Sequence, residues 1–249
     1  MEKMDVLIKK VEDNVVFLTL NRPNQWNSLN RALFLDLRSE LERMEFDESV
    51  SVVVISGQGN KAFCAGIDLK ERAKMPKDEV FPYREAVIRP FFDALGRFPK
   101  PTIAAVNGMA LGGGAEVALA CDIRIASKEA KFAQAEIRWG MIPACGACQR
   151  LRMIVGIGKA KEIIYTGRTL EAREALEWGI YNRVVPAESL MDEARDLAIE
   201  IAKHSPVALR QAKKAIDGGA HISESLDLEF EVSKECYFSG KAMTGPGEF

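Results

Sequence analysis

Three consecutive glycines, residues 112–114, separate an apolar strand-like segment at residues 103–106 from an apolar, helix-forming stretch at residues 117–120. Because glycine has no side chain, such a run lets a ligand come close to the backbone. Glu116 follows it and stands near a helix N-terminus, a place that suits an anion or a developing oxyanion. A tight turn is the simpler interpretation of a glycine run taken alone.

Apolar runs with the character of buried strands alternate with a helix-patterned segment along the first half of the chain. A strand is predicted within residues 7–21, centred on 15–20, and a helix at 29–44. Further strands are predicted at 52–56, 103–106 and 123–127. This alternation indicates an α/β fold with parallel strand pairing. From about residue 189 the pattern is helical, with helices predicted at 190–203, 206–216 and 224–238.

A second acid and a second loop accompany the glycine run. Glu136 ends the apolar run Phe132-Ala133-Gln134-Ala135-Glu136, and the loop 61–69, which contains Cys64-Ala65-Gly66-Ile67-Asp68, follows the strand at 52–56. With the segment 103–116 and Ile142-Pro143, these motifs resemble the enoyl-CoA hydratase/isomerase (crotonase) family from about residue 5 to about residue 240.

The resemblance implies a spiral of repeated β-β-α units. It divides the chain into an acyl-CoA-binding core at residues 1–190 and a C-terminal helical oligomerisation region at residues 191–249. Family members form trimers, often paired into hexamers, so a homotrimer or homohexamer is the implied assembly.

The same resemblance assigns the site residues. Glu116 and Glu136 match the family's acid/base pair, and Ile67 and Gly113 match the two residues whose backbone N–H groups form the oxyanion hole. Family members that only shift a double bond often keep one acid, so the presence of both favours hydration of a 2-enoyl thioester. The implied substrate-binding residues are Lys61, Ala62, Ala65, Gly66, Ile67, Asp68, Gly113 and Ala144.

Hydration of a 2-enoyl thioester needs both the backbone N–H donors and the two acids. Addition of water places negative charge on the thioester oxygen, and two fixed N–H donors stabilise that charge as it develops. Glu116 is assigned as the base that activates water and Glu136 as the acid that supplies the proton to Cα. Neighbouring carboxylates resist double ionisation, so one acid should have a raised pKa. A side chain at Gly113 should abolish turnover, whereas Gly112→Ala is expected to be milder.

Other segments indicate how the coenzyme A portion and the acyl group of the substrate could be bound. Basic residues near Arg22 and Lys61 can meet the phosphates of coenzyme A. The segment 71–99 is mainly apolar and favours an apolar acyl group, although Arg84 and Arg89 can pair with a carboxylated one, and Trp139 can limit chain length. Ala144 stands where most relatives carry glycine, and its methyl group narrows the site.

Five cysteines without secretion features indicate reduced thiols. Cys145 and Cys148 have a C-x-x-C spacing, but His204 and His221 do not supply a second ligand pair, so no metal site is expected and the two cysteines are interpreted as packing residues. No dinucleotide or phosphate-loop motif is present. No cofactor is expected, since coenzyme A is part of the substrate.

A net charge of −2 predicts no general attraction to nucleic acid or an anionic membrane. The N-terminus lacks a secretory signal pattern, and a cytoplasmic location is expected. The leading hypothesis is an enoyl-CoA hydratase of fatty acid metabolism or one acting on a cyclic or branched acyl-CoA. The alternatives are another crotonase-type reaction (double-bond isomerase, dienoyl-CoA hydratase, acyl-CoA hydrolase or decarboxylase) and a non-catalytic, RNA-binding role.

Overall fold

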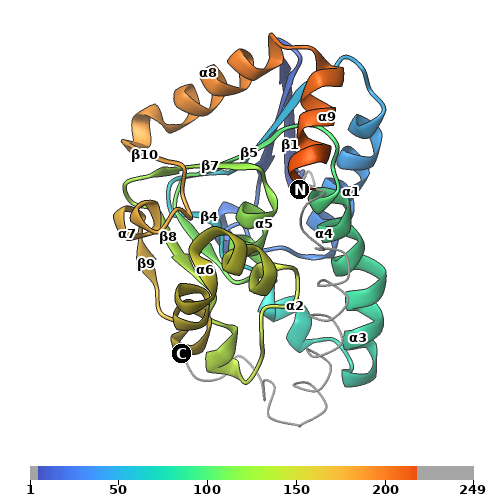
Figure 1. The fold of residues 1–249 in the computed structure, drawn as a ribbon. Coiled ribbons are helices and arrows are strands. Elements are labelled where there is room, and N and C mark those ends of the chain that lie inside the picture. Colours follow the sequence, from blue (N-terminus) through green and yellow to red (C-terminus); the bar gives the residue numbers. More distant parts are fainter. Residues whose placement is uncertain (1–4, 218–249) are drawn as a thin grey trace.

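The computed structural model describes residues 5–217, which form two sheets surrounded by helices (Figure 1). The larger sheet has the strand order β1-β2-β3-β5-β7-β10 and the smaller one β4-β6-β8-β9. The strands are β1 (Leu7–Glu12), β2 (Val15–Leu20), β3 (Val52–Gly57), β4 (Ala62–Cys64), β5 (Thr102–Val106), β6 (Met109–Leu111), β7 (Ile123–Ser127), β8 (Lys131–Ala133), β9 (Leu170–Glu171) and β10 (Arg183–Val185).

Successive strands alternate between the two sheets. After the antiparallel hairpin of β1 and β2, the strands β3, β5, β7 and β10 join the larger sheet in parallel, while β4, β6 and β8 join the smaller one in parallel. Each turn of the chain therefore gives one strand to each sheet, and helices connect the turns. This is the spiral of β-β-α units, and the α/β prediction is confirmed.

The helices are α1 (Arg31–Glu45), α2 (Leu69–Ala73), α3 (Val80–Tyr83), α4 (Arg89–Gly96), α5 (Gly113–Ala120), α6 (Ala147–Thr166), α7 (Ala172–Glu177), α8 (Leu190–Ala202) and α9 (Pro206–Asp217). A π-helical turn at Arg84–Ile88 joins α3 to α4, and a short 3-10 helix spans Glu136–Trp139. The predicted helix at residues 224–238 lies outside the described residues.

The central strands of the larger sheet, β2, β3, β5 and β7, are buried on both faces. Along β2, Phe17 packs in the layer that contains Leu190 of α8, whereas Leu18 belongs to the main core with α1, α4 and α5. In Figure 1, α8 (orange) lies across one side of this sheet and α5 lies on the other. Double burial explains why these strands are continuous apolar runs. In this structure α8 covers its own chain's sheet, and the assembly role of the C-terminal helices stays a prediction.

Two boundaries differ from the sequence-based ones. The single strand predicted within residues 7–21 is a hairpin, because Asp13 and Asn14 have φ values of 48° and 62° and turn the chain between β1 and β2. The helix predicted from Leu29 begins at Arg31 instead, after Asn30, whose side chain accepts a hydrogen bond from the Leu33 N–H at 3.1 Å. Leu29 is free to pair with another segment.

Candidate active site

The loop after β4 is hydrogen-bonded to Leu29. The Leu29 N–H donates to the Gly66 carbonyl at 2.8 Å, and the Asp68 N–H donates to the Leu29 carbonyl at 2.9 Å, which makes a one-residue parallel bridge between Leu29 and Ile67. In such a bridge one residue bonds to both neighbours of its partner. The N–H of Ile67 itself therefore points away from Leu29.

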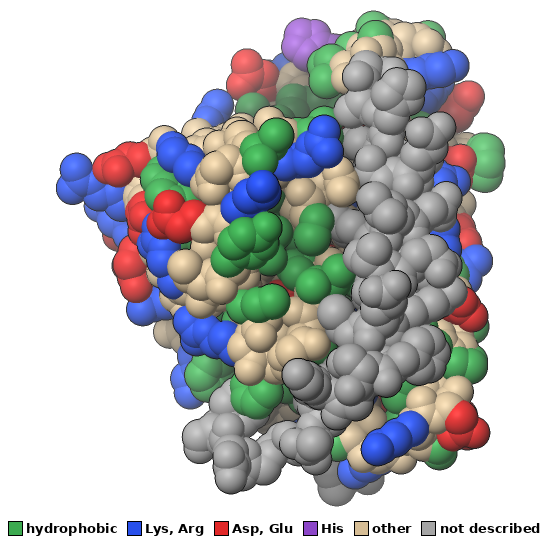
Figure 2. All heavy atoms as spheres, turned by 60° about the horizontal axis from the view of Figure 1, so that its bottom comes forward, with side chains coloured by type: hydrophobic (Ala, Val, Ile, Leu, Met, Phe, Trp, Pro, Cys, Tyr) green, Lys and Arg blue, Asp and Glu red, His purple; other side chains and the backbone are tan. Residues whose placement is uncertain are grey.

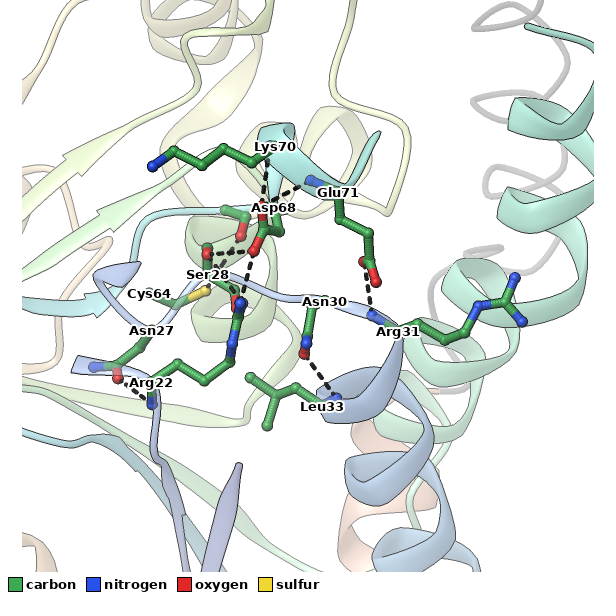
Figure 3. Close-up of polar contacts among 11 residues, drawn as sticks. Arg22, Asn27, Ser28, Asn30, Arg31, Leu33, Cys64, Asp68, Lys70 and Glu71 are labelled. Carbon is green, nitrogen blue, oxygen red and sulfur yellow. Dashed lines mark hydrogen bonds and ion pairs between the residues drawn. The ribbon is translucent and has the colours of Figure 1, made fainter. Parts of the chain in front are cut away.

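Asp68 fixes this loop from its other side (Figure 3). One of its carboxylate oxygens accepts hydrogen bonds from the N–H groups of Lys70 and Glu71 at 3.0 and 3.1 Å and caps α2. The other lies 2.8 Å from the guanidinium of Arg22. Burial alone would raise the pKa of Asp68, but Arg22 and the two amides hold that pKa below its usual value. Arg22 is thus engaged with Asp68, and its expected role with phosphates stays a prediction.

Gly113 brings a second amide to the same place. It is the first residue of α5, where helix geometry provides no intrahelical acceptor for its N–H. A Cβ atom added to Gly113 would lie 3.2 Å from Cγ1 and 3.5 Å from the backbone nitrogen of Ile67. The two loops therefore meet at these two residues, and a side chain at residue 113 would be in tight contact with Ile67.

Gly112 is also constrained. Its φ of +50° with ψ of −123° is a conformation that side-chain-bearing residues avoid, and an added Cβ would lie 3.0 Å from an oxygen of Glu136. Gly112→Ala should therefore strain the backbone, and the prediction that it is milder than Gly113→Val is untested. The backbone at Gly112 is strained for any other residue, and a methyl group there would crowd an acid of the site.

Glu116 lies in the first turn of α5 and is 2% exposed. Its Oε1 accepts hydrogen bonds from the backbone N–H groups of Cys145 at 2.7 Å and Ala147 at 3.3 Å, at the start of α6. Burial raises the pKa of Glu116, and these two donors act against that rise by stabilising the carboxylate.

Glu136 begins the 3-10 helix that follows β8 and is partly exposed, because it faces the cavity between α2, α5 and this helix. Burial by its surroundings and then the charge of Glu116 raise the pKa of Glu136 to about 8. The two carboxyl groups are thus close enough to influence each other. Their environments differ: backbone donors stabilise ionised Glu116, while Glu136 holds its proton near neutral pH.

Comparison with known proteins shows the family to which the chain belongs. The model of the enoyl-CoA hydratase/isomerase family matches residues 10–242. The chain belongs to this family. It is 39% identical to the short-chain-enoyl-CoA hydratase of Clostridium acetobutylicum, over 95% of this chain and 91% of that protein. It is also similar to the crystal structure of an enoyl-CoA hydratase from Bacillus anthracis, with 40% identity, a TM-score of 0.84, and coverage of 96% and 92%.

Most of the site residues that the sequence predicts for this chain line one cavity of about 410 Å³. Its lining includes both acids and the two residues predicted for the oxyanion hole, together with Ala65, Gly66, Asp68 and Ala144. Lys61 and Ala62 do not line it: Lys61 is exposed, and Ala62 is buried in β4, where its carbonyl accepts a hydrogen bond from Asn27 at 2.8 Å. Their predicted contact with the coenzyme A portion is untested.

Sequence reasoning missed the groups that hold Glu116. Both donors are backbone N–H groups, and Cys145 was interpreted only as a packing residue. Cys145 is buried and Cys148 half-buried. Gly146, which precedes α6, has a φ of +108°. A glycine at this position could have indicated a turn into a helix, and the first N–H groups of that helix have no partner within it. Thr169 and Met141 also line the cavity and were not singled out.

Within residues 5–217, no group of three or more His, Cys, Asp and Glu side chains has the arrangement of a metal site. In the same range, no helix has the length and apolar character needed to cross a membrane.

Asp68→Asn should destabilise the loop after β4, because asparagine keeps an oxygen that can cap α2 but loses the ion pair with Arg22. We expect the free energy of unfolding at pH 7 to fall by about 1–3 kcal/mol, measured by denaturant unfolding. A lowered pKa contributes stability above the unfolded value of about 3.9 that is lost as pH falls through the folded value. The difference from wild type should therefore vanish in acid. Asp36→Asn, at an exposed position, is the control. A difference that does not shrink as pH falls below about 3.9 would contradict the ion-pair assignment.

Proposed function

We propose that this chain is an enoyl-CoA hydratase, which adds water across the 2,3 double bond of an acyl-CoA thioester. The observation that carries this proposal is the pairing of two buried carboxyl groups, only one of which accepts backbone hydrogen bonds from the start of α6, beside two converging backbone amides. Glu116 is held by two N–H donors, whereas Glu136 has a pKa raised to about 8. One base and one acid in the same cavity are what hydration requires.

The thioester oxygen is assigned to the space in front of the Ile67 and Gly113 amides. Negative charge grows on this oxygen as water attacks Cβ, and both donors are in place before the reaction begins. Gly113 is also the first residue of α5, so the positive end of the helix dipole faces the same charge. Loss of one such donor typically costs on the order of a hundredfold in rate.

The proton steps follow from the two acids. Glu116 takes a proton from water as its oxygen bonds to Cβ, and Glu136 gives its proton to Cα as the double bond is lost. The pair therefore gains one proton at Glu116 and loses one at Glu136, so its total charge is unchanged over the addition. Because both groups line one cavity, the water that Glu116 activates and the proton that Glu136 supplies can reach the same double bond.

The acyl group is proposed to be short and apolar. The cavity wall carries Val80, Tyr83, Ile88, Trp139 and Ile142. Figure 2 shows the lower face of the molecule, where hydrophobic side chains gather and are bordered by Lys and Arg side chains. A similar protein from Syntrophomonas wolfei, 35% identical over 98% of this chain and 94% of its own length, is a crotonyl-CoA hydratase, which fits this choice.

A carboxylated acyl group is the second candidate, favoured by one observation. Arg84 is buried and lines the cavity in the π-helical turn before α4. The human methylglutaconyl-CoA hydratase is 39% identical to this chain, over 90% of this chain and 66% of that protein. Comparison of crotonyl-CoA with a carboxylated enoyl-CoA, by the loss of absorbance of the conjugated thioester, separates the two. Arg84→Met should reduce turnover of the carboxylated substrate much more than that of crotonyl-CoA if that candidate is right.

Glu116→Gln and Glu136→Gln should each lower kcat for hydration of crotonyl-CoA by at least about a hundredfold, because each removes one proton-transfer group from the cavity. Both substitutions keep the shape of the side chain, so thermal unfolding should change little. The exposed Glu85→Gln, on the segment next to Arg84, is the control. Near-normal hydration by either active-site variant would rule out the two-acid mechanism.

The pH dependence of kcat/KM should reflect the protonation of Glu136. Glu136 must be protonated to supply the proton to Cα, and its pKa is raised to about 8. We therefore expect kcat/KM for hydration to fall as pH rises through about 8, measured under initial-rate conditions. A rate that keeps rising with pH through this range would show that Glu136 acts in its ionised form, and the two roles would have to be exchanged.

A further inference from the structure

The side chain of Gln134 lies against Glu136 and is completely buried. Its amide is 3.1 Å from each oxygen of the Glu136 carboxyl group, with the NH₂ group turned to that side. The environment assigns this orientation, because the other side of the amide faces only hydrogen-bond donors and so must carry the carbonyl oxygen. Gln134 is therefore a hydrogen-bond donor to Glu136.

We propose that Gln134 is a positioning residue that holds the Glu136 carboxyl group toward the substrate and stabilises the carboxylate left when Glu136 gives its proton to Cα. The proposal rests on the proposed hydratase function. The covalent change is the one already described: a C–H bond forms at Cα, the O–H bond of Glu136 breaks, and its electron pair stays on the carboxylate that Gln134 solvates.

The backbone around Gln134 keeps the donor in a fixed position. Its neighbour Ala133 ends β8, which pairs with β6 through Leu111, and the Ala133 carbonyl accepts a hydrogen bond from the Gly112 N–H at 2.9 Å. The same strand pair thus positions Gln134 on one side and the glycine turn on the other. Because the donor is in place before proton transfer, no reorganisation is needed when charge appears on Glu136.

The charged groups that face Glu136 make this donor necessary. Glu116 of α5 contributes negative charge, which disfavours ionised Glu136, and Arg84 of the π-helical turn acts the other way. The remaining charged residues of the cavity wall are Asp68, Glu71, Arg72 and Arg138. Asp68 is paired with Arg22, and Glu71 accepts a hydrogen bond from the Arg31 N–H at 2.9 Å. Gln134 differs from all of these because it does not titrate, so any effect it has on a pH profile must act through Glu136.

Gln134→Met is the test, since methionine has a similar length and no hydrogen-bond donor. We expect kcat for crotonyl-CoA hydration to fall by about 10- to 100-fold with KM within a few-fold, because a hydrogen bond to a developing charge is lost. The donor favours the ionised form, so its loss should also raise the pKa of Glu136 and move the high-pH limb of the profile to higher pH. A lower kcat with an unmoved limb, or an unchanged kcat, would overturn the proposal.

A control and a second variant keep the outcome interpretable. Thr102→Val removes a buried hydroxyl that is hydrogen-bonded to Asp122 at 3.0 Å and does not line the cavity, so it should lower stability without moving the limb. If the methionine variant does not fold, Gln134→Glu retains the shape and can donate only when protonated. Its activity relative to wild type should rise as pH falls, and a ratio independent of pH would contradict the proposal.

Titration of Glu136 without substrate separates this inference from the proposed function. The protein is labelled with ¹³C at the glutamate carboxyl groups and titrated by NMR. The Glu136 resonance is assigned as the one that is absent from Glu136→Gln. It should titrate at higher pH in Gln134→Met than in wild type. If that shift is seen while crotonyl-CoA is not hydrated, the hydratase proposal fails and the role of Gln134 toward Glu136 stands. No shift would refute the role of Gln134 whatever the substrate.

Discussion

The one-residue bridge between Leu29 and Ile67 determines how the cavity is built. By pairing with Gly66 and Asp68, Leu29 holds the loop after β4 in an extended conformation and turns the Ile67 N–H to the opposite side. There it meets the start of α5, where a side chain at residue 113 would be in tight contact with Ile67. A loop without this pairing would place a flexible amide where a fixed donor is required, and the advantage of a preorganised site would be lost.

Around this pair of amides, the chain places two carboxyl groups in unlike settings. Glu116 is turned toward the start of α6, where the N–H groups of Cys145 and Ala147 stabilise its ionised form. Glu136 faces the cavity, and burial together with the charge of Glu116 favours its protonated form. The fold thus gives two chemically identical side chains different hydrogen-bonding environments. The amide of Gln134 then fixes the direction of the one that holds the proton.

The sequence predicted the parts of this structure that side-chain patterns determine. The strands at 52–57, 102–106 and 123–127 are apolar runs buried on both faces, and the predicted boundaries are within about one residue. The three-residue strand β4 shows no periodicity, so only the family resemblance implied it. Leu29 was assigned to a helix because its apolar side chain fits the helical spacing, although its backbone pairs with Ile67. The backbone donors to Glu116 carry no residue signature, and the conformation of Gly112 cannot be read from composition.

The central claim is that Ile67 and Gly113 donate to the thioester oxygen, and the vibrational spectrum of the bound carbonyl tests it most directly. The double variant Glu116→Gln with Glu136→Gln should bind crotonyl-CoA without turnover, and labelling the thioester carbonyl with ¹³C isolates its stretching band in an infrared difference spectrum. Two hydrogen bonds to this oxygen weaken the C=O bond, so the band should move to lower frequency than in free crotonyl-CoA. Adding Gly113→Val should return it toward the free value. A band at the free frequency in bound substrate would contradict the account.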